Sequence, residues 1–328
     1  MRRRDFIKVI AASATVWPVA ARAQGSPVRP LIGLLSPLSA VAARRNVAAF
    51  RSSLRDLGYL EGSNATLALR YGDGAAERMP SLARELIALN PDVIVAGASP
   101  GALAAYNLTR TIPIVAIIGE NPVTAGFAQS VARPGANVTG TWVLGDDTLV
   151  GKGLDFLRLA VPGLTRIGAM FNPADPFDEL QIRRLSAAAP AAGVSIEVIQ
   201  IRDLGNLESV AAEITRTSVQ GLFVGIAPFW LSARTEVTAM VARLNLPAIY
   251  GWREFADAGG LMSYGPNLPE MYRLSARLVD KILKGTKPGD LPFELPTRNE
   301  LIVNLKTAKA MGLNISESFL VLADEVIE

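Results

Sequence analysis

The side chains that could do chemistry in this sequence are hydroxyls, amides, carboxylates and aromatic rings that follow short apolar runs. Ser36 ends the first apolar run, Ser99 comes just after the third, and Asn172 ends the run that opens the second half. If these runs are parallel strands, their carboxyl ends meet at one edge of a sheet, which is where ligands bind. We therefore expect Ser36 and Ser99 to hold polar ends of a small molecule, together with Asn121, and Asn172 to help enclose it from the other side.

Further strand ends add carboxylates and aromatic rings to this set. Glu120 and Asn121 follow the fourth run and can take hydrogen bonds from an amine or amide, although Asn-Pro is also common turn chemistry. The aromatics are concentrated in the second half, where they can either enclose a flat ligand group or serve only in packing. The candidate ligand-binding residues are Ser36, Ser99, Glu120, Asn121, Asn172, Phe229, Tyr250, Glu254 and Tyr264.

Ser99 has a second possible role in the segment Gly97-Ala98-Ser99-Pro100-Gly101. It can cap a helix that has Pro100 at its first position. The free backbone N–H groups of such a helix start would suit a ligand carboxylate. Capping and ligand binding both remain open, and one side chain can do both.

Two residue types are missing, and this narrows the chemistry. The 328 residues include no cysteine and no histidine. Disulfides, cysteine nucleophiles, the Ser-His-Asp arrangement and nearly all transition-metal sites are therefore excluded. An enzyme that uses Glu120 with Asp175 or Glu254 stays as an alternative. The composition favours reversible binding, and we expect no catalytic residue, metal or cofactor.

The first residues predict export. Arg3-Arg4-Asp5-Phe6-Ile7-Lys8 has the form of a twin-arginine motif, and Ala21-Arg22-Ala23 is an A-x-A-like cleavage site. The apolar run between them, 9–21, is too short to span a bilayer, which takes about 20 residues. We expect cleavage after Ala23 and a periplasmic protein without a lipid anchor. The twin-arginine and general secretory routes both stay open, and an amphipathic helix is the alternative.

Removing this segment changes the charge argument. Residues 1–23 contain five basic side chains and one acidic one, so the remaining 305 residues carry a net charge of −1 in place of the +3 of the full chain. The basic character therefore belongs to the export signal. It gives no support for a nucleic acid or an anionic membrane as partner.

Alternating strands and helices must position the candidate residues. Short β-branched runs alternate with amphipathic stretches, which predicts an α/β fold with parallel sheets covered by helices on both faces. The strands are expected at 31–36, 65–71, 92–96 and 113–118, and the helices at 40–57, 76–89 and 99–109.

The same pattern restarts in the second half. Gly168 follows Gly33 by 135 residues, and Gly193 follows Gly58 by the same distance, each pair at matching points of a strand–helix unit. We therefore expect two Rossmann-like lobes with a ligand cleft between them.

The remaining segments are expected to connect the lobes. They comprise 136–142, 261–266, a helix at 269–284, a proline-rich surface segment at 286–298, and a final strand at 301–304 followed by a short helix. The predicted domains are a cleaved signal at 1–23, a first lobe at 29–142 plus about 266–290, a second lobe at 143–265, and a C-terminal segment at 291–328 whose lobe is left open.

Seven sequence blocks run along the chain in order. They are IGLLSP at 32–37, LGYLEG at 57–62, PDVIVAG at 91–97, ARPGANVTG at 132–140, LPAIYGWREF at 246–255, GLMSYGPN at 260–267 and LKTAKAMGL at 305–313. Together they resemble the ABC transporter substrate-binding family that includes the tryptophan/tyrosine-binding importers.

The resemblance implies a type I periplasmic binding protein with a multi-segment hinge and, for characterised relatives, amino acid ligands that are often aromatic. One position departs from the family pattern. Relatives usually read Gly-Asp-Pro-Val where this chain reads Glu120-Asn121-Pro122-Val123. If that aspartate meets an α-amino group, Asn121 removes its charge, and Glu120 can replace it only with a different reach.

The expected function is that of an extracytoplasmic solute-binding component of an ABC importer. It would capture an amino acid, or a related aromatic or amide compound, as a monomer and deliver it to permease subunits of the inner membrane. An exported ligand-sensing module for a membrane receptor is the main alternative, because its fold would be the same.

Overall fold

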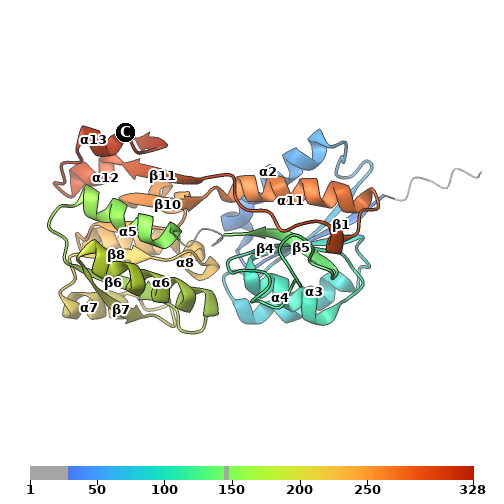
Figure 1. Ribbon diagram of the computed structural model, residues 1–328, viewed down its shortest axis with the longest axis horizontal. Helices are drawn as coiled ribbons and strands as arrows, with labels where there is room; N and C mark the ends of the chain where they lie inside the picture. The colour runs from blue at the N-terminus through green and yellow to red at the C-terminus, as the bar shows by residue number, and fades with distance from the viewer. Residues whose placement is uncertain (1–28, 144–147) are drawn as a thin grey trace, which may run out of the picture.

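The computed structural model describes residues 29–143 and 148–328, and these form two α/β lobes side by side (Figure 1). The predicted export signal lies outside the described residues. Within the part of the chain that the structure describes, no helix is long and apolar enough to cross a membrane.

The first lobe is built on a parallel sheet of five buried or half-buried strands in the order β2-β1-β3-β4-β5. The hydrophobic runs predicted as strands form four of these five strands, as expected for a parallel sheet whose two faces are covered by helices. Its strands are β1 (Leu31–Ser36), β2 (Thr66–Tyr71), β3 (Val93–Gly97), β4 (Ile114–Ile118) and β5 (Val138–Trp142).

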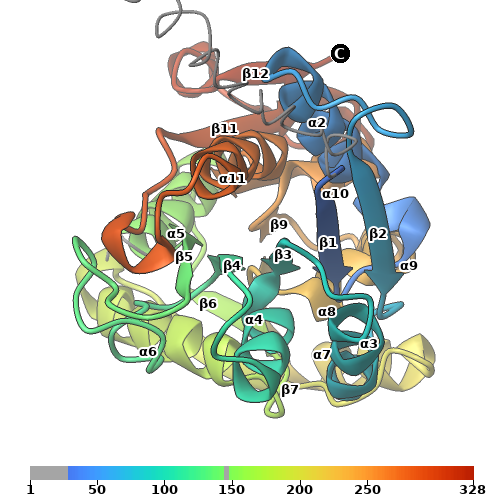
Figure 2. The same ribbon diagram turned by 90° about the vertical axis from the view of Figure 1, so that its right-hand side faces the viewer.

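Helices cover both faces of this sheet (Figure 2). On one face α2 (Ala40–Asp56) packs beside α11 (Leu268–Leu283), and on the other lie α3 (Met79–Ile87), preceded by the short 3₁₀ turn η1 (Ala76–Arg78), and α4 (Ala98–Leu108). Alternate β1 side chains serve the two faces, with Leu34 in the core under α2 and Leu35 in the core over α3 and α4.

The second lobe has a seven-stranded sheet in the order β12-β11-β10-β9-β8-β6-β7. It is parallel except for the antiparallel pair β10–β11. The strands are β6 (Arg166–Phe171), β7 (Ser195–Gln200), β8 (Gly221–Val224), β9 (Ala248–Tyr250), β10 (Met262–Pro266), β11 (Asn299–Asn304) and β12 (Glu325–Ile327). The helices are α5 (Leu149–Ala160), α6 (Pro176–Ala192), α7 (Leu207–Thr217), α8 (Pro228–Ser232), α9 (Arg234–Arg243), α10 (Arg253–Asp257), α12 (Leu305–Ala310) and α13 (Glu317–Leu320).

The two lobes repeat one design, as the glycine spacing predicted. The order β7-β6-β8-β9-β10 in the second sheet matches β2-β1-β3-β4-β5 in the first. Gly33 and Gly168 occupy crowded strand positions, where an added Cβ would lie 2.9 Å from Leu86 and 2.8 Å from Ile199. Gly58 and Gly193 follow the equivalent helices with φ of 95° and 66°, a conformation that favours glycine.

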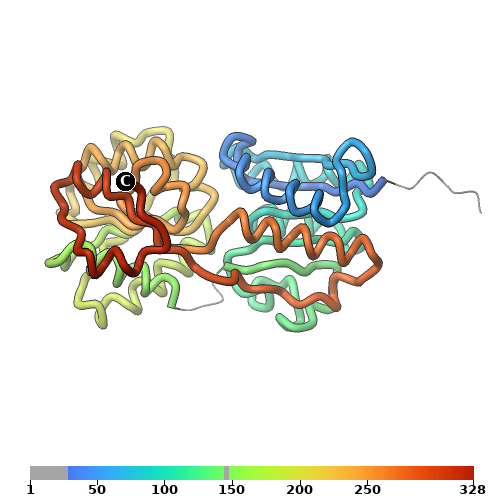
Figure 3. Tube along the Cα trace, turned by 90° about the horizontal axis from the view of Figure 1, so that it is seen from above, coloured from blue at the N-terminus to red at the C-terminus, as the bar shows by residue number. Residues whose placement is uncertain are grey.

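The chain passes between the lobes three times: between β5 and α5, between β10 and α11, and between α11 and β11 (Figure 3). The segment 136–142, expected to connect the lobes, contains the fifth strand of the first sheet. The proline-rich segment carries η2 (Pro288–Asp290) and is not wholly superficial, since Leu291 and Phe293 are buried and Phe293 N–H donates to Val131 O of the first lobe. β12 follows the strand that was expected to be the last. We propose lobe limits at these three passages, with β11 and β12 in the second lobe.

Candidate functional site

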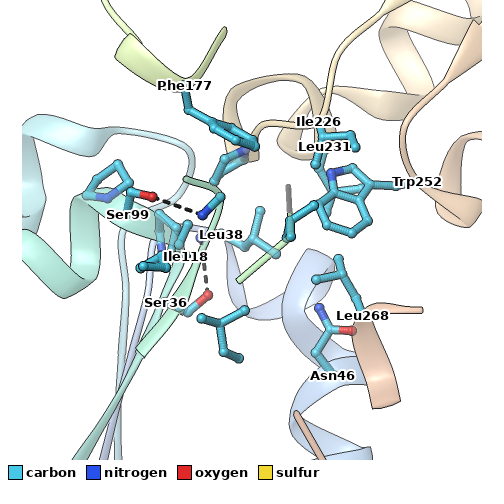
Figure 4. A pocket seen from close by; sticks show the side chains of 18 of the residues that line it. Ser36, Leu38, Asn46, Ser99, Ile118, Phe177, Ile226, Leu231, Trp252 and Leu268 are labelled. Atoms are coloured by element: carbon cyan, nitrogen blue, oxygen red, sulfur yellow. Dashed lines mark hydrogen bonds between the residues drawn. The ribbon is translucent and has the colours of Figure 1, made fainter. Parts of the chain in front are cut away.

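A cavity between the lobes brings part of the candidate set together (Figure 4). Its volume is about 60 Å³ in terms of the space open to the centres of water-sized spheres. One water needs about 10–15 Å³ by this measure, so the cavity has room for several waters or for part of a small molecule. The wall is mainly apolar, with Leu38 and Ile118 from the first lobe facing Phe177, Ile226 and Leu231 from the second.

Ser36 and Ser99 line the first-lobe wall, and both hydroxyls have protein partners. Ser36 Oγ accepts a hydrogen bond from Leu38 N–H at 3.2 Å and lies within reach of the Tyr272 hydroxyl. Ser99 Oγ donates to the Glu120 carboxylate and accepts from Gly119 N–H at 3.2 Å. Both residues therefore shape the wall, and Ser99 also positions Glu120, which does not itself line the cavity.

The capping role predicted for Ser99 is wrong. Helix α4 begins at Ala98, its N-cap is Gly97, and no side chain caps it. Ala98 itself has φ of 56°, the left-handed region that an alanine rarely enters. Strained backbone of this kind is concentrated at binding sites, and here it sits in the cavity wall between β3 and α4.

The second lobe contributes a carboxylate at the same end of the cavity. Asp175 lines the wall and is the N-cap of α6, where its Oδ1 accepts from Phe177 N–H at 2.9 Å. Burial raises the pKa of Asp175, and the negative charge of Glu120 raises it further. Two carboxylates, one from each lobe, thus influence each other across the cleft.

Behind this wall, a buried network holds the loops of the second lobe. Asp178 accepts hydrogen bonds from Asn172 N–H at 3.0 Å, from Trp230 Nε1–H at 2.8 Å and from Gln181 Nε2–H at 3.1 Å. Gln181 Oε1 in turn accepts from Ile226 N–H at 2.7 Å. Burial raises the pKa of Asp178 to about 7. The network fixes the two strand ends that face the first lobe.

Two predicted residues face a neighbouring groove. Asn172 and Phe229 line an interlobe groove of about 500 Å³, which Asp175 also borders. Asn172 Oδ1 accepts from Ala174 N–H at 3.0 Å, a turn contact. Asn172 follows the end of β6 as expected and Phe229 lies in α8, but both lie beside the interlobe cavity and not in its wall.

Four other predicted site residues do not line the interlobe cavity and instead contact neighbouring residues of their own lobe. Tyr250 stacks on Phe255 with ring centroids 4.6 Å apart, and Tyr264 meets Phe156 edge to face at 4.8 Å. Both line only a small cavity inside the second lobe. Tyr264 points to the face that α5 covers, whereas the Tyr250 ring packs against Phe255 of α10. Asn121 and Glu254 also do not line the interlobe cavity. Asn121 Oδ1 accepts from Val123 N–H at 2.8 Å in a turn, and burial raises the pKa of Glu254 in the first turn of α10.

The structure adds wall residues that sequence reasoning did not select. Asn46 reaches the cavity from α2, and Leu268 and Tyr272 reach it from α11. Phe177 comes from the first turn of α6, and Trp252 from the N-cap of α10. Strand ends could not reveal the first four, because they lie on helices, whereas Trp252 follows β9 by two residues and belongs to the aromatic residues concentrated in the second half. Among the described residues, no group of three acidic side chains is placed to hold a metal ion.

Comparison with known proteins then identifies the family. The sequence profile of the family described as ABC transporter substrate binding protein matches residues 31–327. This chain belongs to that family. The resemblance carried by the seven blocks is confirmed, and because the family is one of extracytoplasmic binding proteins, the carboxylate-enzyme alternative is set aside.

Relatives of this substrate-binding protein are known by sequence and by structure. A tyrosine-binding protein of Clostridioides difficile (strain R20291) is 25% identical over 264 residues, which is 80% of this chain and 75% of the relative. The structure of the ABC domain in complex with L-Trp from Streptococcus pneumonia has a TM-score of 0.83 and 22% identity, covering 91% of this chain and 100% of that one.

The ligand-free, open structure of a substrate binding protein with adhesive properties from Clostridium difficile has a TM-score of 0.66 and 23% identity, covering 91% of this chain and 99% of that one. The two-lobed fold, that of type I periplasmic binding proteins, is also shared with sugar-binding structures. The predicted fold class is thereby confirmed.

Proposed function

We propose that this substrate-binding protein captures an amino acid, or a related aromatic or amide compound, in the interlobe cavity and delivers it to an ABC importer. The observation that carries the proposal is a cavity with apolar walls from both lobes, the Asp175 carboxylate in its wall, and the Glu120 carboxylate bound to the lining residue Ser99. Apolar walls suit a hydrophobic side chain, and paired carboxylates suit an ammonium group. The relatives that bind tyrosine and tryptophan support the same ligand class.

The proposed ammonium site explains how the protein can bind an amino group although it has Asn121 where relatives usually have aspartate. Glu120 is held by Ser99, and Asp175 approaches from the other lobe, so that both carboxylates repel each other when no cation lies between them. A ligand ammonium would neutralise this repulsion. The charge that position 121 lacks is then supplied by its neighbour and by the second lobe.

Ligand binding and lobe closure are one event in this proposal. A ligand that contacts both lobes gains contacts only when they are closed, and this difference shifts the population toward closure. The TM-score is higher with the tryptophan complex than with the open, ligand-free structure, which is what a closed arrangement would give.

Export and partners follow from the family and the first residues. We propose cleavage after Ala23, a periplasmic monomer, and docking of the closed form on permease subunits. A sensory receptor as partner would use the same ligand site. Recovery of the importer's permease with the purified protein would support the importer, and failure to recover it in the presence of ligand would argue for the receptor.

A thermal-shift screen against amino acids, aromatic acids and small amides tests the ligand class. A ligand present at 100 times its Kd stabilises the folded protein by about 2.7 kcal/mol and so raises the Tm. If no compound of these classes raises the Tm, the proposed ligand class is wrong.

Asp175→Asn tests the ammonium site. Asparagine also caps helices well, so α6 should keep its start. Loss of one charged hydrogen bond, worth about 1.5–3 kcal/mol, should weaken L-tryptophan binding by about 10- to 150-fold. Binding of indole-3-propionate, which lacks the amine, should change little. Asp155→Asn on the exposed surface of α5 is the matched control, and equal losses for both compounds in Asp175→Asn would contradict the assignment.

A further inference from the structure

Asn46 is a buried amide in the cavity wall whose oxygen has no partner. It lies on α2, is 1% exposed, and its Oδ1 atom makes no hydrogen bond within the described residues. Figure 4 shows the side chain pointing from the helix toward the cavity, next to Leu268. Native proteins pair nearly all buried polar groups, so an unpaired one in a ligand cavity calls for a partner supplied from outside.

Other polar side chains of the cavity wall have hydrogen-bond partners within the protein. Ser36 and Ser99 are both hydrogen-bonded to the protein, and the Asp175 carboxylate across the cleft accepts from Phe177 N–H. Besides Asn46, only Trp252 among the lining residues has a buried polar atom without a partner, its Nε1–H. Both unpaired groups are neutral.

The position of Asn46 relates to the two ends of the cavity. In Figure 4, Ser99 and Phe177 lie on one side and Asn46, Leu268 and Trp252 on the other. Ser99 and Phe177 mark the carboxylate end, because their contacts hold Glu120 and Asp175. Asn46 therefore faces the part of a ligand that lies away from its ammonium group.

We propose that Asn46 is a specificity-determining residue that accepts a hydrogen bond from a neutral hydroxyl or ring N–H at the apolar end of the ligand. The inference rests on the proposed function, since it needs an amphipathic ligand in this cavity. A neutral group fits because Leu268 and the Trp252 ring offer no counter-charge. A ligand without such a group would leave the Asn46 oxygen unpaired, and sites of this kind discriminate strongly against the analogue that lacks the polar atom.

Binding affinities of two matched pairs of ligands, measured by calorimetry, test this role of Asn46. They also show whether the donor on the ligand is a hydroxyl or a ring N–H. L-Tyrosine against L-phenylalanine reports on a hydroxyl, and L-tryptophan against L-3-benzothienylalanine, in which sulfur replaces the N–H, reports on a ring N–H. The wild-type protein should prefer the polar member of one pair by about tenfold or more. In Asn46→Leu that preference should fall below about threefold, mainly because the polar member binds less tightly.

Stability of the ligand-free protein gives a second readout. Leucine is close in size to asparagine and leaves no unpaired group, so Asn46→Leu should raise the Tm. Asn304→Leu is the matched control, because Asn304 is also buried but has both amide atoms paired, with Ala256 O and Thr307 N–H, and its variant should lower the Tm. A purely structural Asn46 would behave like Asn304. If Asn46→Leu does not fold, Asn46→Ala should show the same loss of preference.

The outcomes separate this inference from the proposed function. If the wild type binds none of the four compounds, both fail. If it binds them without preference, or if Asn46→Leu and Asn46→Ala keep the wild-type preference, the role of Asn46 is wrong while the proposed function stands.

Discussion

At the scale of residues, Asp178 is a buried carboxyl group that accepts hydrogen bonds from the second-lobe loops behind the cavity wall. It is 2% exposed and receives three hydrogen bonds, yet burial outweighs them and raises its pKa from the usual 3.8 to about 7. A carboxyl group with a raised pKa binds a proton more tightly in the folded than in the unfolded chain. At a pH between the unfolded-state pKa and the folded-state pKa, the folded chain therefore carries more protons than the unfolded chain. The free energy of unfolding then falls as the pH rises.

Asp178→Asn should flatten this pH dependence. The wild-type Tm should fall between pH 5 and pH 8, and the variant should lose a clear part of that fall because residue 178 no longer titrates. The asparagine Oδ1 can still accept from Asn172 N–H and Trp230. Asp175 and Glu254, whose pKa values burial also raises, keep some slope of the same sign in both proteins. Equal slopes would show that Asp178 does not titrate in this range.

How far single residues could be predicted depends on where they lie in the chain. Ser36 and Ser99 were found because a strand end predicts its own position at the edge of a sheet. Tyr250 ends β9 and Tyr264 lies in β10, but their rings pack against α10 and α5, and the sequence pattern does not show which face of the sheet each helix covers. Asn46 reaches the cavity only through the long-range placement of its helix.

At the scale of elements, the two lobes meet through the loop after β4 and the first turn of α6. Gly119 lies against the Phe177 ring so closely that a Cβ at this position would be 2.5 Å from two ring carbons. The absence of a side chain lets the second lobe reach the carboxylate end of the cavity. Glycine is needed here for close approach.

Gly119→Ala should therefore hinder closure. Overpacking of this kind costs about 1–3 kcal/mol, which weakens ligand binding by about 5- to 150-fold. The Tm of the ligand-free protein should change little if the lobes are free to open. The measurement is the Kd of L-tryptophan by calorimetry. Gly101→Ala is the control, since its Cβ would meet nothing closer than 3.6 Å, and unchanged affinity in Gly119→Ala would exclude a contact at closure.

Elements were easier to predict than site residues, for a physical reason. The strands and helices of the first lobe bury long apolar patterns, and the predicted ranges differ from the observed ones by a few residues, although 76–89 divides into η1 and α3. β5 was mistaken for a connection because its sequence, VTGTW, alternates weakly and contains a glycine. β12 spans three residues, too few for a periodic signal.

At the scale of the whole molecule, an ion pair joins the two lobes. Arg45 of α2 lies 2.6 Å from Asp257 of α10, and Asp257 is also 3.4 Å from Arg253. Arg253 is paired in addition with Glu325 of β12. Because its two side chains come from different lobes, we expect this contact to break when the lobes open.

Removing this pair should weaken binding modestly. The Arg45 and Asp257 side chains are 51% and 35% exposed, and such pairs contribute about 0.2–1 kcal/mol, which corresponds to about 1.4- to 5-fold in Kd. Arg45→Ala and Asp257→Asn should each raise the Kd, and the double variant should lose little more than either single one. Adding salt to about 0.5 M should narrow the gap between wild type and variants. A gap that does not change with salt would contradict an electrostatic origin.

The three passages of the chain between the lobes have a practical consequence for optical sensing. Because the number of passages is odd, the described chain starts in the first lobe at Arg29 and ends in the second lobe at Glu328. A fluorescent donor attached near Arg29 and an acceptor attached near Glu328 would therefore be on different lobes. Their energy transfer would then change with each capture and release of the ligand, and the protein could serve as the frame of a reagentless biosensor.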